Sequence, residues 1–193
     1  MAERILVGAV LPVPEPWRSL LAAARTGLGD PLGDLVPAHI TLLPHTWVRP
    51  GELPGLVRHV RTVAAAQVPV VMELDGVASF HPTSDVVYLP LTIGARECAD
   101  LAAALRSGPV AVDLAYPFHP HLTLAHNRGP GAYARARSLL GRFRAAFTAT
   151  ELALSTSTGS LTEWKPLQRI ALTGTPAPAS ARLIESSPAA RRP

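Results

Sequence analysis

The chain has 193 residues, of which 48% are hydrophobic, and its formal net charge is +4 at pH 7. This length can bury one substantial core, whereas the apolar runs, such as 5–13 and 68–72, are too short or too interrupted to span a bilayer. Half of the net positive charge lies in residues 176–193. Residues 1–175 contain no run of Lys and Arg of the kind that contacts the phosphates of a long DNA duplex. The composition favours a small anionic ligand or an RNA end as the binding partner.

The elements predicted in chain order alternate between strands and helices. Apolar runs bounded by Pro and Gly predict strands, and Ala- and Leu-rich amphipathic stretches predict helices. The predicted strands cover residues 4–11, 36–48, 70–80, 86–93, 116–126, 148–155 and 161–172. The predicted helices cover residues 17–25, 52–66, 96–106 and 133–147.

The two ends of the chain carry separate expectations. Residues 1–4 lead directly into an apolar strand, without the basic start, long apolar segment and cleavage site of a secretory signal, so we expect a cytoplasmic protein. From residue 176 onward the chain is rich in Pro, Ala, Ser and Arg and has little apolar bulk to bury. We therefore interpret residues 1–175 as a single bilobal domain and 176–193 as a disordered tail.

Cys98 is the single cysteine of the chain. An internal disulfide and a cysteine-based zinc site are therefore excluded. Because Cys98 falls within a predicted helix, we expect it to be a small buried apolar residue rather than a nucleophile.

The most informative motif is the tripeptide His-x-Thr, which occurs at His39 to Thr41 and again at His121 to Thr123, 82 positions later. With seven His in the chain, chance alone supplies fewer than one such tripeptide, so a pair in matching apolar contexts is informative. Side chains two apart on a strand share a face, so each motif places an imidazole beside a hydroxyl. The intervening and following apolar residues then point into a core; they are Ile40, Leu42, Leu122 and Leu124.

The order of features after each motif repeats. Each motif is followed by a second His (His45, His126), by an Arg with Gly and Pro (Arg49, Arg128), by an amphipathic helix and by a pair of strands. This pattern indicates a degenerate internal duplication. We therefore predict an α+β fold with two lobes related by a pseudo-twofold axis, in which two antiparallel sheets line a central cleft and helices pack outside.

Two imidazoles and two hydroxyls are the groups that a metal-free phosphodiester exchange needs. One imidazole can take a proton from the entering oxygen and the other can give one to the leaving oxygen, since an unperturbed His titrates near neutrality. The hydroxyls of Thr41 and Thr123 can donate to phosphate oxygens or orient the rings. With one His neutral and one protonated, the scheme predicts a bell-shaped pH profile.

The paired motifs, their spacing and the two-lobed order resemble the two-histidine (2H) phosphoesterase superfamily, particularly its 2'-5' RNA ligase and 2',3'-cyclic phosphodiesterase branch. The resemblance covers residues 4 to 173. It implies a bilobal α+β fold and hydrolysis of a 2',3'-cyclic phosphate, on an RNA end or a nucleotide, to the 2'-phosphate. It also implies that His39, Thr41, His121 and Thr123 are the catalytic residues and that no cofactor is needed.

Four further residues are candidates for substrate binding. Trp47 and Phe118 flank the motifs and could stack a base, although core packing is the alternative interpretation of both. Arg49 and Arg128 could contact a phosphate, although turn arginines are usually solvated. The remaining His are interpreted as structural or surface groups; they are His45, His59 and His81.

Three alternatives stay open. A zinc site could use His119, His121 and His126, but His126 falls on the other face of the strand and no acidic cluster is near. The same pocket could bind an RNA end or a nucleotide without catalysis. By microscopic reversibility, the same groups could also catalyse the joining of RNA ends through a 2'-5' bond. In each case we expect a monomer without duplex DNA or a membrane as partner, and the residues do not assign the base and the acid.

Overall fold

The computed structural model describes residues 4–110, 112, 114–126, 129, 131–157, 159 and 164–176. Its strands are β1 (Ile5–Pro12), β2 (His39–Val48), β3 (Val70–Asp75), β4 (Ala78–Ser79), β5 (Val86–Ile93), β6 (His121–His126), β7 (Arg144–Ala149), β8 (Glu151–Ser157) and β9 (Lys165–Ala171). Its α-helices are α1 (Trp17–Gly27), α2 (Leu53–Ala66), α3 (Ala95–Arg106) and α4 (Gly131–Leu140), and a short 3-10 helix, η1 (Pro50–Glu52), precedes α2.

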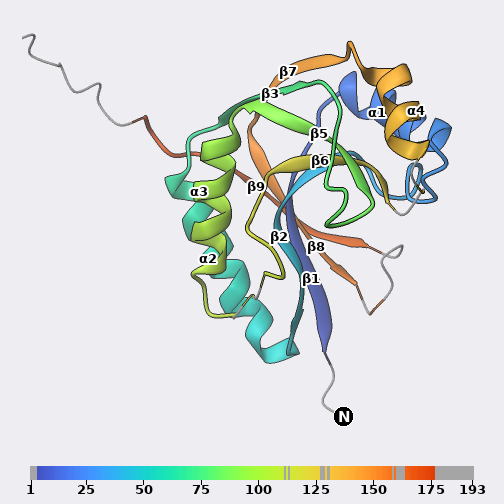
Figure 1. Cartoon of the computed structure of the whole chain (residues 1–193). Helices are drawn as coiled ribbons and strands as arrows, with labels where there is room; N and C mark the ends of the chain where they lie inside the picture. Colours follow the sequence, from blue (N-terminus) through green and yellow to red (C-terminus); the bar gives the residue numbers. More distant parts are fainter. Residues whose placement is uncertain are drawn as a thin grey trace, which may run out of the picture.

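Two antiparallel sheets form the centre of the protein (Figure 1). The first has the strand order β2-β1-β8-β9. In the second, β5 pairs with β6, β3 and the short β4, and β7 pairs with β3. Each His-x-Thr strand thus lies beside one central strand, β2 beside β1 and β6 beside β5, and β2 and β6 contact each other.

The two lobes share the same register around their motifs. Pro12 lies opposite His39 in the first sheet, and Pro90 lies opposite His121 in the second. The residue before each proline, a leucine, pairs with the middle residue of the motif in both sheets. This agreement, residue by residue, confirms the predicted bilobal α+β fold.

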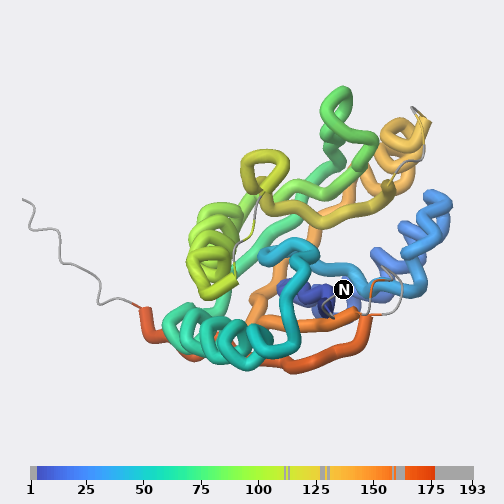
Figure 2. Tube along the Cα trace, turned by 90° about the horizontal axis from the view of Figure 1, so that it is seen from below, coloured from blue at the N-terminus to red at the C-terminus, as the bar shows by residue number. Residues whose placement is uncertain are grey.

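Helices α1 and α3 each pack against the motif strand of the other sheet. Helix α1, which connects β1 to β2, contacts β6 of the other sheet, and α3, which connects β5 to β6, contacts β2. Helices α2 and α3 lie side by side at one end of the molecule, and α1 and α4 lie at the opposite end (Figures 1 and 2). Each motif strand is therefore supported by a helix of the other half of the chain.

The core is built from the alternate residues that face away from the motif side chains. Ile40, Leu42, Leu122 and Leu124 are fully buried, as the alternation predicts. Each helix adds a buried stripe at helical spacing, such as Leu56, Val60 and Ala64 in α2. Cys98 of α3 is fully buried, with its Sγ 3.7 Å from Sδ of Met72, and burial raises its pKa to about 12. The expectation of an inert apolar cysteine is thus confirmed.

Three element boundaries differ from the sequence prediction. Residues 144–147, predicted as the end of a helix, belong to strand β7. Helix α4 stops at Leu140 because Gly141 closes it; a Cβ on Gly141 would lie 2.4 Å from the carbonyl oxygen of Arg137. The predicted strand 148–155 is divided between β7 and β8. Both motif strands also begin at their His rather than earlier, since Pro37 and Pro120 interrupt the preceding segments.

Two further expectations concern membranes and the tail. In the part of the chain that the structure describes, no helix has the length and apolar character needed to cross a membrane. The disordered tail was predicted over residues 176–193, and of these residues 177–193 lie outside the described part of the chain.

Candidate active site

His39 and His121 are the first residues of β2 and β6, where the two sheets meet. Both side chains are half-buried. Strands β2 and β6 contact each other, and the charge of His121 lowers the pKa of His39. The fold therefore places side by side two motif strands whose His are 82 positions apart in the chain.

Each of these rings is held by the same backbone contact. Nδ1 of His39 lies 2.8 Å from the carbonyl oxygen of Pro37, and Nδ1 of His121 lies 2.7 Å from that of His119. A carbonyl oxygen only accepts, so each Nδ1 carries the proton and donates it. In the neutral ring, Nε2 is then the unprotonated nitrogen, available to accept a proton from a substrate.

The environment of His39 favours its neutral form. Burial lowers the pKa of His39 to about 4, and the nearby charges of Arg25, His45 and His121 act in the same direction. The hydrogen bond to Pro37 opposes this shift. His39 is therefore neutral in the free protein at pH 7 and can act as a base.

His121 is surrounded by aromatic rings. Phe80 lies edge-on to it at 4.9 Å between ring centroids, and Tyr88 lies at 5.3 Å. Burial is the main cause that lowers the pKa of His121, with smaller contributions from the charges of His119 and His126. The hydrogen bond to the His119 carbonyl acts in the opposite direction. Phe80 and Tyr88 themselves stack at 4.1 Å, which fixes this wall of the site.

Thr41 and Thr123 lie two residues after the motif His, on the same face of their strands, and both are half-buried. Their cross-strand partners are Val10 and Tyr88, respectively. Each hydroxyl is thus fixed by a strand pair beside an imidazole. Such preorganised neutral donors suit the non-bridging oxygens of a phosphate.

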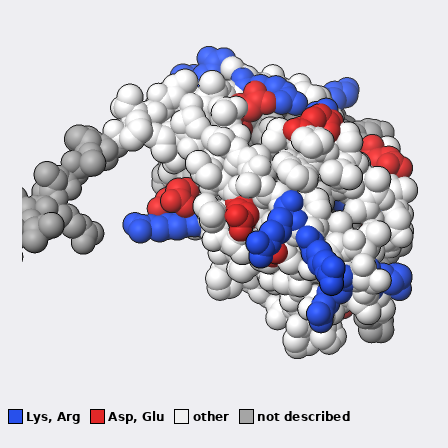
Figure 3. Space-filling model, turned by 90° about the horizontal axis from the view of Figure 1, so that it is seen from above, with Lys and Arg blue, Asp and Glu red and all other residues white. Residues whose placement is uncertain are grey.

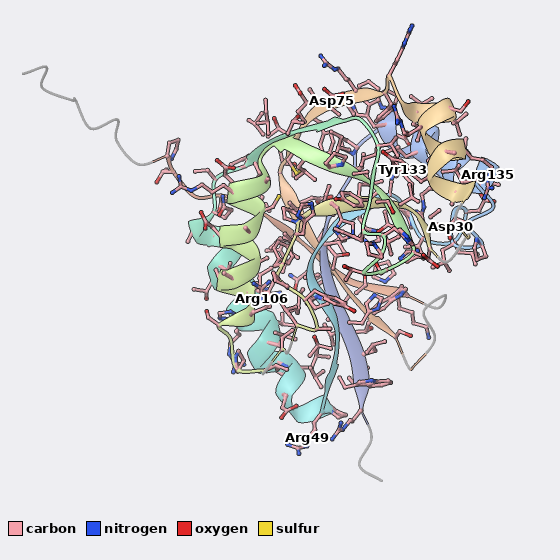
Figure 4. The ribbon with its side chains drawn as sticks, in the orientation of Figure 1. Asp30, Arg49, Asp75, Arg106, Tyr133 and Arg135 are labelled. Atoms are coloured by element: carbon pink, nitrogen blue, oxygen red, sulfur yellow. The ribbon has the colours of Figure 1, made fainter. Side chains whose placement is uncertain are left out.

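A buried ion pair supports the segment that leads into His39. Arg25 of α1 donates from Nε and Nη2 to Asp30, at 3.2 and 3.1 Å, and from Nη1 to the carbonyl oxygen of Val36. The side chains of Arg25 and Asp30 are 4% and 0% exposed. Figure 4 shows Asp30 at the end of the molecule where α1 and α4 lie. Since Val36 directly precedes Pro37, this pair fixes the backbone that holds Nδ1 of His39.

A cavity of about 200 Å³ lies beside His39 and Thr41, on the face of the first sheet. All four strands of that sheet contribute to its lining, together with residues 35–38. His45 and Trp164 also line it, and their rings stack with centroids 4.5 Å apart. His45 is thus placed in the site region, whereas the sequence interpretation treated it as a structural or surface group.

The four predicted substrate-binding residues lie in different places. Trp47 is 49% exposed and is not among the residues that line the cavity. Arg49 follows the end of β2 that is far from His39, and Figure 4 shows it at the edge of the molecule. It forms an exposed ion pair with Glu52. Phe118 packs against the core beneath the guanidinium of Arg106, 5.0 Å from its ring centroid. Arg128 lies outside the described residues.

The structure also bears on the zinc and DNA alternatives. Within the described ranges, no group of three or more His, Cys, Asp or Glu side chains is arranged to hold a metal ion, and this includes His119, His121 and His126. On the face seen in Figure 3, acidic side chains lie between the basic ones, and the basic ones do not form one band. Some basic side chains form ion pairs with acidic ones, such as Arg144 with Asp75.

Comparison with known proteins identifies the family. The family model described as the 2'-5' RNA ligase superfamily matches residues 12–160, which include both His-x-Thr motifs. The chain belongs to this superfamily. It is similar to provisionally named phosphoesterases of Bacillus licheniformis, 32% identical over 96 residues, and of Halalkalibacterium halodurans, 30% identical over 115 residues. The matches cover 50% and 60% of this chain but only 56% and 65% of these relatives.

Solved structures of other proteins have a similar fold. Escherichia coli LigT complexed with 3'-AMP matches with a TM-score of 0.66 at 23% identity, over 89% of this chain and 99% of LigT. A protein of Thermus thermophilus matches with a TM-score of 0.62 at 22% identity, over 88% of this chain and 98% of its own. These likenesses confirm the predicted two-histidine phosphoesterase-like architecture.

Sequence reasoning missed several residues that shape the site. The Leu-Pro pairs at Leu11-Pro12 and Leu89-Pro90, 78 positions apart, mark the strands that pair with the motifs and were a readable signal of the repeat. The sequence around Arg25 and Trp164 gives no such signal, because each residue reaches the site only through tertiary packing.

Proposed function

We propose that this protein is a phosphodiesterase that opens a 2',3'-cyclic phosphate, on an RNA end or a nucleotide, to the 2'-phosphate without a metal ion. The observation that carries the proposal is the matched state of His39 and His121. Both lie at the junction of the sheets, both donate Nδ1–H to a backbone carbonyl, and both have a threonine on the same strand face. Membership of the 2'-5' RNA ligase superfamily supports it.

The reaction follows from the two Nε2 atoms. One neutral imidazole takes a proton from water as the water oxygen bonds to phosphorus. The bond from phosphorus to the 3'-oxygen then breaks, and that oxygen takes a proton from the other imidazole, which is protonated at the start. The hydroxyls of Thr41 and Thr123 donate to the non-bridging oxygens as charge builds on them.

Substrate binding prepares the protonated ring. In the free protein the pKa values of His39 and His121 are both lowered, chiefly by burial. A bound phosphate anion next to a ring raises the pKa of that ring, because the opposite charge stabilises the imidazolium. The substrate thus helps to charge the acid while the other ring stays neutral as the base.

The decisive experiment measures hydrolysis of 2',3'-cyclic AMP in the presence of EDTA, with the product identified as the 2'- or the 3'-phosphate. We expect turnover to the 2'-phosphate, and a loss of about 10² to 10⁴ in kcat for His39→Ala and for His121→Ala. His81→Ala, which removes an exposed His, serves as the matched control. Full activity in either motif variant, or complete loss on chelation, would contradict the proposal.

The alternative function is binding without catalysis. A protein of that kind would bind adenosine 2'-phosphate and 2',3'-cyclic AMP but release the cyclic phosphate unchanged. The same four residues also permit ligation, in which the 5'-hydroxyl of another RNA takes the place of water: its oxygen bonds to phosphorus, the bond from phosphorus to the 3'-oxygen breaks, and a 2'-5' bond results. Incubation of RNA ends bearing a 2',3'-cyclic phosphate and a 5'-hydroxyl tests this ligation.

A further inference from the structure

The cavity beside His39 extends away from the catalytic groups along the face of the first sheet. At its one end lie Pro12 and His39, which pair across β1 and β2, and at its other end lies Gly8. Pro12 is four positions after Gly8, a length of about 13 Å along a strand. A phosphate held at the motifs therefore leaves most of this cavity unfilled, whereas a whole nucleotide extends along it.

The far end of the cavity is walled by two stacked rings. His45 and Trp164 lie with their centroids 4.5 Å apart and their planes 29° from parallel. Both lie over Gly8, where an added Cβ would be 3.4 Å from Cδ2 of His45 and 3.7 Å from Cη2 of Trp164. These distances are ordinary van der Waals contacts, so the two rings lie directly over this end of β1.

The lining combines this aromatic wall with few polar groups. Gln168 lies opposite the buried Leu154 in the sheet, and its Oε1 accepts from Nε of Arg61 in α2 at 3.3 Å, so its amide is directed toward α2 and not into the cavity. Arg169 also lines the cavity, but its guanidinium pairs with Glu151. A mostly apolar cavity with an aromatic wall fits a flat heteroaromatic ring.

We propose that this cavity binds the nucleobase of the nucleotide whose cyclic phosphate lies at His39 and His121, and that the base packs against the His45–Trp164 ring pair. The inference rests on the proposed function for the position of the phosphate, and it adds a subsite that selects nucleotides over other cyclic phosphates. Stacking of a base on an aromatic side chain tolerates every base.

The test compares Trp164→Ala with the unmodified protein on two substrates. One is 2',3'-cyclic AMP, and the other is methyl riboside 2,3-cyclic phosphate, which lacks a base. We expect Trp164→Ala to raise KM for 2',3'-cyclic AMP by about 5- to 150-fold with kcat little changed. On the base-free substrate the variant should match the unmodified protein. Leu167→Ala, which removes an exposed apolar side chain of β9 outside the cavity lining, is the matched control.

Two further measurements keep the outcomes distinct. Trp164→Phe, which retains an aromatic face, should recover most of the affinity, whereas a purely structural role would not discriminate between the two substrates. Titration with adenosine 2'-phosphate measures base binding without turnover, so a protein with no cyclic phosphodiesterase activity but Trp164-dependent binding would refute the proposed function alone. Equal losses on both substrates, or a loss in Trp47→Ala instead, would overturn the subsite.

Discussion

His39 and His121 occupy equivalent positions in the two lobes, each opposite a proline of the central strand and each tied through Nδ1 to the carbonyl two residues before it. The equivalence extends to the next pair on the same face, where Thr41 and Thr123 follow. The neighbours of the two rings differ: Arg25 is near His39, whereas Phe80 and Tyr88 surround His121. The two rings therefore start from the same tautomer in different electrostatic environments.

The shared geometry predicts that the two histidines act as one unit. We expect the double variant His39→Ala/His121→Ala to lose little more activity than the worse single variant, because one ring without the other cannot complete the proton transfer. The measurement is single-turnover hydrolysis of 2',3'-cyclic AMP by the four proteins. Losses that multiply would show that each ring acts separately.

The threonines should contribute to the transition state more than to substrate binding. For Thr41→Val and Thr123→Val we expect kcat to fall by about 10²- to 10³-fold, as for loss of one oxyanion donor, with a smaller change in KM. Valine keeps the branched shape, so the strand pairing should persist. The Ser variants retain the hydroxyl and serve as controls. Activity that fell equally in the Ser and Val variants would assign these residues a packing role.

Much of the fold was readable because its signals are local. The alternation around Ile40 and Leu122 placed the motif side chains and the core correctly, and the repeat of the motif gave the two lobes. The prediction failed where a short apolar segment suits both helix and strand, as in residues 144–147, because only pairing with β3 decides between them. Gly141 was the local signal that could have ended the helix earlier.

The site was predictable only in its central groups. His39 and His121 stand in motifs, so the sequence named them, but His45 gains its place in the cavity from a stack with Trp164, 119 positions later (164 minus 45). Likewise, Phe80 approaches His121 because β4 and β6 flank the same strand. Contacts of this kind follow from sheet order, which the chain pattern does not specify.

The lowered pKa of His39 predicts how stability depends on pH. The folded ring titrates at about 4 and the unfolded ring at 6.5. Between these pH values the unfolded chain binds more protons than the folded protein, so the free energy of unfolding falls as the pH falls from 6.5 toward 4. Below pH 4 this ring is protonated in both states and causes no further change with pH. The shift corresponds to about 3 kcal/mol at most, and access of water to the half-buried ring reduces that value.

Urea unfolding between pH 4 and pH 7 measures this dependence, and an NMR titration of the His39 ring gives its midpoint directly. His39→Asn removes the titrating group, so its free energy of unfolding should change less over the same range. His121, whose pKa is also lowered, should contribute in the same direction. A His39 midpoint at or above 6.5 would contradict the desolvated environment described for the ring.

Arg25 is predicted to be a positioning residue for His39. Arg25→Leu leaves the fully buried carboxylate of Asp30 without its ion-pair partner, and we expect it to destabilise the fold by about 3 to 5 kcal/mol. The double variant Arg25→Leu/Asp30→Leu removes both charges and should recover most of that stability.

The double variant separates positioning from folding, because it still lacks the bond from Arg25 to the Val36 carbonyl. We expect its kcat to stay low although the protein is folded, since the segment that holds Nδ1 of His39 is no longer fixed. The pKa of His39 should also rise, because the nearby positive charge that disfavours the imidazolium is gone. Kinetics at several pH values, together with NMR of His39, measure both effects. Full recovery of kcat in the stable double variant would leave Arg25 with a structural role alone.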